Sequence, residues 1–147
     1  MEENVMRNSA ELKLNESAIG FLKETAKWAN FLAIMGFVGI VLMVLIAFFM
    51  GTLFTALPNA DELPYAGPIM IITYLIVAFL YFFPILYMYR FATKMKVALN
   101  RNNQEVLNDA LMNLKSHYKF IGILTIVFLA FYTVILLLGL IAGLAAM

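Results

Sequence analysis

The chain has 147 residues, of which 64% are hydrophobic and 13% are charged, and its formal net charge is +1. A water-soluble domain of this size could not bury so much apolar surface, because a small fold hides only about two-thirds of what its unfolded chain exposes, so the composition indicates an integral membrane protein. The small net charge provides no basic field that would attract nucleic acid, and the absence of cysteine excludes disulfides and thiol chemistry.

Residues 1–16 show no sustained hydrophobic period, and we expect a flexible N-terminal tail there. The tail mixes acids and bases, which does not fit a cleavable signal peptide, so the first span is expected to stay in the mature protein. The following stretch, SAIGFLKETAKWA, is predicted to be a short amphipathic helix capped by Ser17. It either lies along the membrane interface or forms the first turns of the first spanning helix, and the pattern does not decide between these.

Three apolar runs without charged residues follow, at about residues 31–57, 69–89 and 120–140. Each is long enough to cross the hydrocarbon core as a helix, which takes about 20 residues. We therefore predict an all-α integral membrane protein in which residues 17–147 form a single transmembrane helical domain with three spans.

The basic residues all lie on one side of the predicted spans. Four lysines and arginines precede the first span and six lie between the second and third, and together these are all ten in the chain. The only charged residues in the loop between the first two spans are Asp61 and Glu62. These adjacent carboxylates are expected to keep the loop solvated. By the positive-inside rule, the N-terminus and the second loop are cytoplasmic and the C-terminus is external.

Residues 90–119 keep a helical pattern between the second and third spans but become amphipathic. The second span is expected to continue on the apolar face of Phe91, Met95 and Ala98. Asn102, with Glu105 three residues later, resembles a capping arrangement that opens a new helix. An apolar stripe then recurs at Leu107, Leu111, Leu114 and Tyr118. Packing of this stripe against the extended second span predicts an antiparallel cytoplasmic helical hairpin.

Amphipathic side chains flank the predicted spans and are expected to anchor them at the membrane interface. These anchors are Trp28, Arg90, Lys115, His117, Tyr118 and Lys119. His117 is the only histidine, and a single imidazole cannot build a metal site without further ligands, so we interpret it as part of this collar. Anionic lipid headgroups are the partners that such a collar favours.

Within the spans the polar groups are hydroxyls, and the absence of charged residues there weighs against a proton relay formed by this chain alone. The hydroxyl residues are Tyr74, Tyr81, Thr125, Tyr132 and Thr133. Tyr81 and Tyr132 fall at similar depth, so a hydrogen bond between them is feasible. Pro84 should kink the second span and leave the carbonyl of Leu80 free for a nearby hydroxyl. We interpret these groups first as packing contacts and second as the lining of a solute path.

Small residues predict two places where helices approach closely. One stripe consists of Ala47, Gly51 and Thr55, and the other is the GxxxG pair Gly139 and Gly143. Each could be used within one chain or between chains.

Signatures of catalysis are missing from the sequence: it has no phosphate-binding glycine loop, no paired histidines and no nucleophile elbow. We therefore expect a noncatalytic protein without a cofactor, either an accessory or scaffold subunit of a larger membrane complex or a homo-oligomer. The alternative is an oligomeric channel or transporter component with a hydroxyl-lined path.

Two regions carry a resemblance to a known family: ETAKWANFLAIMGFVGI at the first span, and LYFFP followed by the polar segment and LKSHYKFIGILTI. Over most of residues 20–130, the chain resembles a family of small bacterial membrane proteins classed as a domain of unknown function. The resemblance implies a multi-helix fold in the bacterial inner membrane, and it brings no activity and no functional residues.

Overall fold

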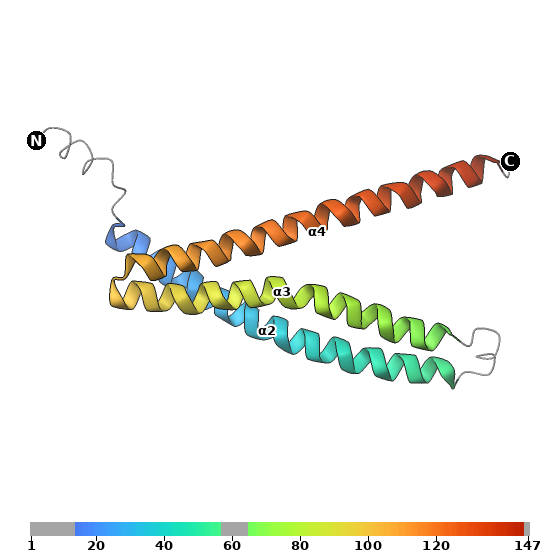
Figure 1. Cartoon of the computed structure of the whole chain (residues 1–147), viewed down its shortest axis with the longest axis horizontal. Coiled ribbons are helices and arrows are strands. Elements are labelled where there is room, and N and C mark those ends of the chain that lie inside the picture. Colours follow the sequence, from blue (N-terminus) through green and yellow to red (C-terminus); the bar gives the residue numbers. More distant parts are fainter. Residues whose placement is uncertain (1–13, 57–64, 146–147) are drawn as a thin grey trace, which may run out of the picture.

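The structure is a computed structural model that describes residues 14–56 and 65–145. These residues form three long helices and no strand: α2 (Glu16–Thr55), α3 (Ala66–Arg101) and α4 (Gln104–Ala145) (Figure 1). Each helix is long and apolar enough to cross a membrane, so the predictions of an all-α fold and of three candidate spans are confirmed. Most of the predicted N-terminal tail, together with Asp61 and Glu62, lies outside the described residues.

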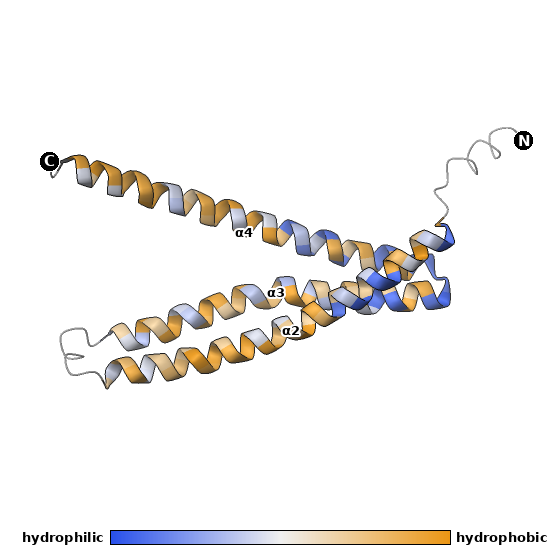
Figure 2. Ribbon diagram, turned by 180° about the vertical axis from the view of Figure 1, so that it is seen from behind, coloured by the Kyte–Doolittle hydropathy of each residue, from blue (hydrophilic) through white to orange (hydrophobic). Residues whose placement is uncertain are grey.

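The helices are much longer than a bilayer requires. α2 has 40 residues and α4 has 42, which at 1.5 Å per residue makes each about 60 Å long, against a hydrocarbon core of about 30 Å. Figure 2 shows where the excess lies, because hydrophilic residues gather at the end where α2 begins, α3 ends and α4 begins. We call this end the polar end; the opposite halves of the helices are predominantly apolar.

The N-cap of α2 lies two residues before the predicted one, and the helix runs without a break. The side chain of Asn15 accepts a hydrogen bond from the Ala18 N–H at 2.8 Å, so the N-cap is Asn15 and the prediction of Ser17 is wrong. Ser17 lies in the first turn of a helix that continues to Thr55. The stretch from Ser17 to Ala29 therefore forms the first turns of α2, and the described chain contains no separate amphipathic helix before the span.

Two asparagines form the turn between α3 and α4. Asn102 closes α3 in the left-handed conformation (φ 52°, ψ 41°), which asparagine tolerates better than most residues. The side chain of Asn103 then accepts hydrogen bonds from the N–H groups of Glu105 at 2.9 Å and Val106 at 3.1 Å. The cap of α4 is thus Asn103 and not Asn102, because Asn102 is already used to end α3.

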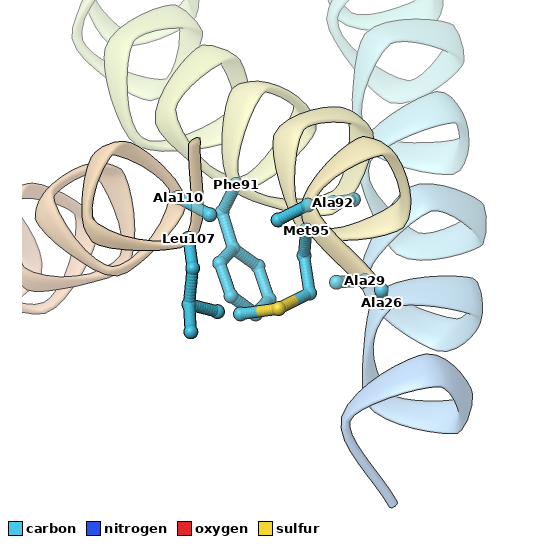
Figure 3. Close-up of a cluster of buried hydrophobic side chains, with 8 residues drawn as sticks. Ala26, Ala29, Phe91, Ala92, Met95, Leu107 and Ala110 are labelled. Atoms are coloured by element: carbon cyan, nitrogen blue, oxygen red, sulfur yellow. The ribbon is translucent and has the colours of Figure 1, made fainter. Parts of the chain in front are cut away.

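The apolar core lies at the polar end, where all three helices meet (Figure 3). Its buried members are Ala26 and Ala29 of α2, Phe91, Ala92, Met95 and Ala98 of α3, and Leu107 and Ala110 of α4. Phe91 and Met95 are the largest side chains that are fully buried, so the apolar face predicted for the end of α3 is confirmed. The alanines around them let the helix backbones approach closely.

The face of α4 that packs on α3 differs from the predicted stripe. Leu107 is buried, but Leu111 and Tyr118 are 43% and 67% exposed. Ala110 and His117 are buried instead, at three and ten residues after Leu107, which places them on the same side of an α-helix. The packed face is therefore turned from the predicted one, because the stripe was chosen by side-chain size and an alanine with a histidine fills the interface.

Candidate functional site

The first close contact joins the apolar ends of α2 and α3, far from the polar end. A Cβ atom built on Gly67 would lie 2.7 Å from the carbonyl oxygen of Gly51 and 2.7 Å from Cγ2 of Thr55, and one built on Gly51 would overlap the side chain of Ile71. Ala47, one turn before Gly51, is fully buried. The structure thus places the predicted stripe of Ala47, Gly51 and Thr55 against the start of α3, where it packs within the chain.

The second contact is a hydrogen bond between α3 and α4 at a proline. The Nδ1–H of His117 donates to the carbonyl oxygen of Pro84 across 2.7 Å, and the imidazole is only 6% exposed. Both residues are buried, so the bond is shielded from water and is stronger than an exposed one. The prediction offered the carbonyl of Leu80 to a hydroxyl; the structure instead joins the carbonyl of Pro84 to the histidine.

The acceptor determines which ring nitrogen of His117 carries the proton. A carbonyl oxygen only accepts, so the proton of His117 must sit on Nδ1. The ring also meets the edge of Tyr118, with centroids 5.4 Å apart and planes at 77°. With one nitrogen occupied by the backbone and the ring buried, His117 is placed to hold α4 against α3 and is poorly placed to attack a substrate.

Toward the polar end, an ion pair joins the same two helices. The ammonium of Lys94 lies 2.6 Å from a carboxylate oxygen of Asp109, and the side chains are 40% and 47% exposed. An ion pair as exposed as this contributes about 0–1 kcal/mol. Its value is to fix the register of α3 and α4 rather than to stabilise them strongly.

A groove of about 410 Å³ opens between α2 and α4, with α3 as its floor. Its floor and sides are apolar and include Ala29, Leu32, Met88, Phe91 and Leu114. Its rim carries the polar or amphipathic groups of Glu24, Thr25, Trp28 and Tyr118 and the exposed apolar side chain of Phe21. The volume is within the range of ligand-binding clefts, which is about 300–1,000 Å³. We call this feature the interhelix groove.

The ring of Phe120 on α4 lies 5.9 Å from that of Phe83 on α3, and toward its C-terminus α4 diverges from the other two helices (Figure 1). No residue in its most apolar stretch is buried within the described chain, whereas α2 and α3 each have buried residues in theirs. A Cβ atom on Gly139 or Gly143 would meet nothing within 4 Å in that part of the chain. The predicted GxxxG pair is therefore not used in the contacts that the structure describes.

The hydroxyl groups are not gathered into a common path. Thr125 and Thr133 donate to the carbonyl oxygens one turn earlier in their own helix, at 2.9 and 2.8 Å. Tyr74, Tyr81 and Tyr132 are exposed. Between residues 65 and 145 there is no hydrogen bond between Tyr81 and Tyr132. Because Phe120 lies against Phe83 and His117 against Pro84, Tyr81 faces the region of Phe120, and Tyr132 lies about 18 Å further along α4. The two tyrosines therefore do not fall at similar depth. The feasible bond between them is absent from this arrangement.

Five of the six predicted anchors are exposed on the polar half of the molecule: Trp28, Arg90, Lys115, Tyr118 and Lys119. His117 is the exception, since its ring faces Pro84 and not the surroundings. Anchoring at a membrane interface stays a prediction for all six. The sequence reasoning missed Gly67 and the buried role of His117; the signal for His117 was its place on one helix face with Leu107 and Ala110.

Within residues 14–56 and 65–145, no three histidine, cysteine, aspartate or glutamate side chains come together. No protein-family model, no curated protein and no solved structure matches the chain. A function is therefore inferred from the helix contacts and surfaces of this chain.

Proposed function

We propose that this chain is a noncatalytic membrane subunit whose third helix pairs with another membrane protein or with a second copy of the chain. The observation that carries the proposal is the unequal packing of the three helices. α2 and α3 pack together from the polar end to Gly51 and Gly67, while the apolar part of α4 has no buried residue. Pairing would give that helix the contacts it lacks.

Small residues on α4 support the same role. Gly139 and Gly143 are one helical turn apart, and nothing in the described chain occupies the space beside them. In lipid, helix association depends on close backbone approach and packing, and small residues four apart permit it. Of the candidate reactive side chains, the one histidine, His117, is bonded to the backbone of α3. An assembly or scaffold role is therefore favoured over catalysis.

The proposed setting is the bacterial inner membrane, with the N-terminus in the cytoplasm and the C-terminus outside. The packed ends of α3 and α4 would then form a cytoplasmic hairpin. What supports this orientation is that the lysines and arginines of the described residues lie in the polar halves of the helices, because cytoplasmic segments carry the excess of such residues. The bacterial assignment comes from the family resemblance of the sequence.

A substitution on α4 tests the pairing. Gly139→Leu should reduce association by a factor of about 10 or more, since filling a close helix contact costs about 1–3 kcal/mol. The matched control is Gly122→Leu on the same helix, where a side chain also meets nothing within 4 Å. Molar mass by light scattering in mild detergent, and copurification of partners from the native membrane, measure the result.

Two outcomes would count against this proposal. Wild-type chain that stays monomeric and brings down no partner would remove its basis, as would equal association of the Gly139→Leu and Gly122→Leu proteins. Solute flux through vesicles that contain only the purified chain would favour the transport alternative. Thr125 and Thr133, whose hydroxyls bond to their own helix, are poor candidates to line such a path.

A further inference from the structure

The interhelix groove combines features that belong together at a membrane surface. Its apolar side chains, Leu32, Met88 and Leu114, lie within about two turns of the predicted cytoplasmic ends of the three spans. Its rim carries the indole of Trp28 and the phenol of Tyr118, both largely exposed. Tryptophan and tyrosine favour the depth of the lipid headgroups. The groove is therefore apolar where acyl chains begin and polar where headgroups lie.

Four lysines lie beside this groove on two helices, while the one charged side chain that lines the groove itself is that of Glu24. Lys23 and Lys27 border a neighbouring hollow on α2 that shares Glu24 and Trp28 with the groove. On α4, Lys115 and Lys119 directly follow the groove residues Leu114 and Tyr118, and all four lysines are exposed. Glu24 is the carboxylate on the rim. The surroundings thus carry an excess of positive charge, which complements a phosphate.

The space below the groove also suits an acyl chain. α2 and α4 both pack along α3 and barely contact each other, and α4 then diverges from the other two helices toward the apolar end (Figure 1). Toward the apolar end, the exposed residues of the diverging helices are apolar (Figure 2). A lipid with its glycerol region in the groove would extend its chains along these apolar surfaces.

We propose that the interhelix groove binds one bilayer phospholipid with an anionic headgroup. Its phosphate lies over the neighbouring hollow on α2, beside Lys23 and Lys27, and the upper part of an acyl chain covers Leu32, Met88 and Leu114 in the groove. This goes beyond the pairing of α4 and needs only that part of the proposed function which places the polar end at the membrane surface. The alternative occupant of the groove is a protein segment. We favour a phospholipid because the neighbouring lysines suit a phosphate.

Filling the groove tests where the lipid sits. The full chain is reconstituted in nanodiscs of equal phosphatidylglycerol and phosphatidylcholine, released into mild detergent, and examined by native mass spectrometry for retained lipid. Leu32→Trp should lower the retained phosphatidylglycerol at least about fivefold, because the larger side chain occupies the apolar space. Ile34→Trp is the control, since Ile34 is a similarly exposed α2 residue outside the groove, and it should retain lipid as the wild type does.

Removing charge tests the headgroup. Lys23→Gln with Lys27→Gln should lower the preference for phosphatidylglycerol over phosphatidylcholine by roughly fivefold per lysine. The matched control, Lys96→Gln with Arg101→Gln, removes the same charge from exposed positions that border neither the groove nor the neighbouring hollow and should leave the preference unchanged. Glu24→Gln should raise it.

The proposal is overturned if the wild type retains both lipids equally, or if Leu32→Trp and Ile34→Trp behave alike. It is also overturned if Leu32→Trp leaves lipid retention intact and abolishes copurification of a protein, because a protein segment then occupies the groove. Failure of the pairing function is distinguishable, since Gly139→Leu should change association and leave lipid retention as it is. The orientation of the chain in the membrane is tested separately, by labelling single introduced cysteines from either side of the membrane.

Discussion

The hydrogen bond from His117 to Pro84 gives the sharpest test of how α4 is held. His117→Phe keeps a ring of similar size at a position that is 6% exposed and removes the donor that lies 2.7 Å from the carbonyl oxygen. Loss of one buried hydrogen bond costs about 0.5–1.5 kcal/mol, and a buried acceptor left without its partner brings the cost toward 3 kcal/mol. We expect about 1–2 kcal/mol, because the helix offers this carbonyl a second donor in the N–H of Met88.

Two measurements follow the change. Unfolding by denaturing detergent gives the free energy of unfolding, and spin labels on α3 and α4 report the separation of the two helices. The chain has no cysteine, so single cysteines at the exposed positions Ile76 and Ile135 can be labelled without background. His117→Phe should lower the free energy of unfolding and broaden the distance distribution between the labels.

Matched variants separate the bond from the ring. His117→Asn keeps an N–H donor near the position of Nδ1 and should recover part of the loss despite its smaller volume. Lys119→Ala changes an exposed neighbour and should alter stability by no more than about 0.5 kcal/mol. A His117→Phe protein with wild-type stability and an unchanged distance distribution would refute the assignment of His117 as the residue that holds α4.

The remaining predictions concern the other helix contacts. Gly67→Ala should cost about 1–3 kcal/mol in the same unfolding assay, because its Cβ meets the backbone of Gly51. Gly39→Ala, with nothing within 4 Å, should stabilise by up to about 1 kcal/mol through helix propensity, and equal effects of the two changes would contradict the close crossing. For the pair Lys94 and Asp109, a double-mutant cycle should give a coupling below about 1 kcal/mol that falls with added salt; a larger coupling that salt does not screen would mean that the pair is more buried than its exposure indicates.

The membrane spans and part of the packing were open to prediction from sequence. Long apolar runs without charge have few solutions besides spanning helices, so the three helices followed directly. The face of Phe91, Met95 and Ala98 was also predictable, because it interrupts a polar segment at helical spacing. Both signals depend only on local periodicity, which a single sequence contains.

The rest depended on contacts between distant residues. His117 was interpreted as an interfacial group because it stands beside two lysines, and only the approach of Pro84, 33 residues away, makes it a buried donor. Gly67 falls between the first two predicted spans, at 31–57 and 69–89, although it lies in the first turn of α3, where its close neighbours are on α2. Asn102 and Asn103 are both suitable caps, and the end of α3 decides which one opens α4.

The contacts described here hold α4 near its N-terminal end. Its packing on α3 is concentrated between Leu107 and Phe120, so the direction of the long apolar part is set at its base. From His117 to Ala145 the helix extends about 42 Å, and a change of roughly 10° at the base moves its far end by about 7 Å. A lipid in the interhelix groove and the bond to Pro84 both act at this base. Occupancy of the groove should therefore shift the distance between labels on Ile76 and Ile135, and the shift should be lost in Leu32→Trp and kept in Ile34→Trp.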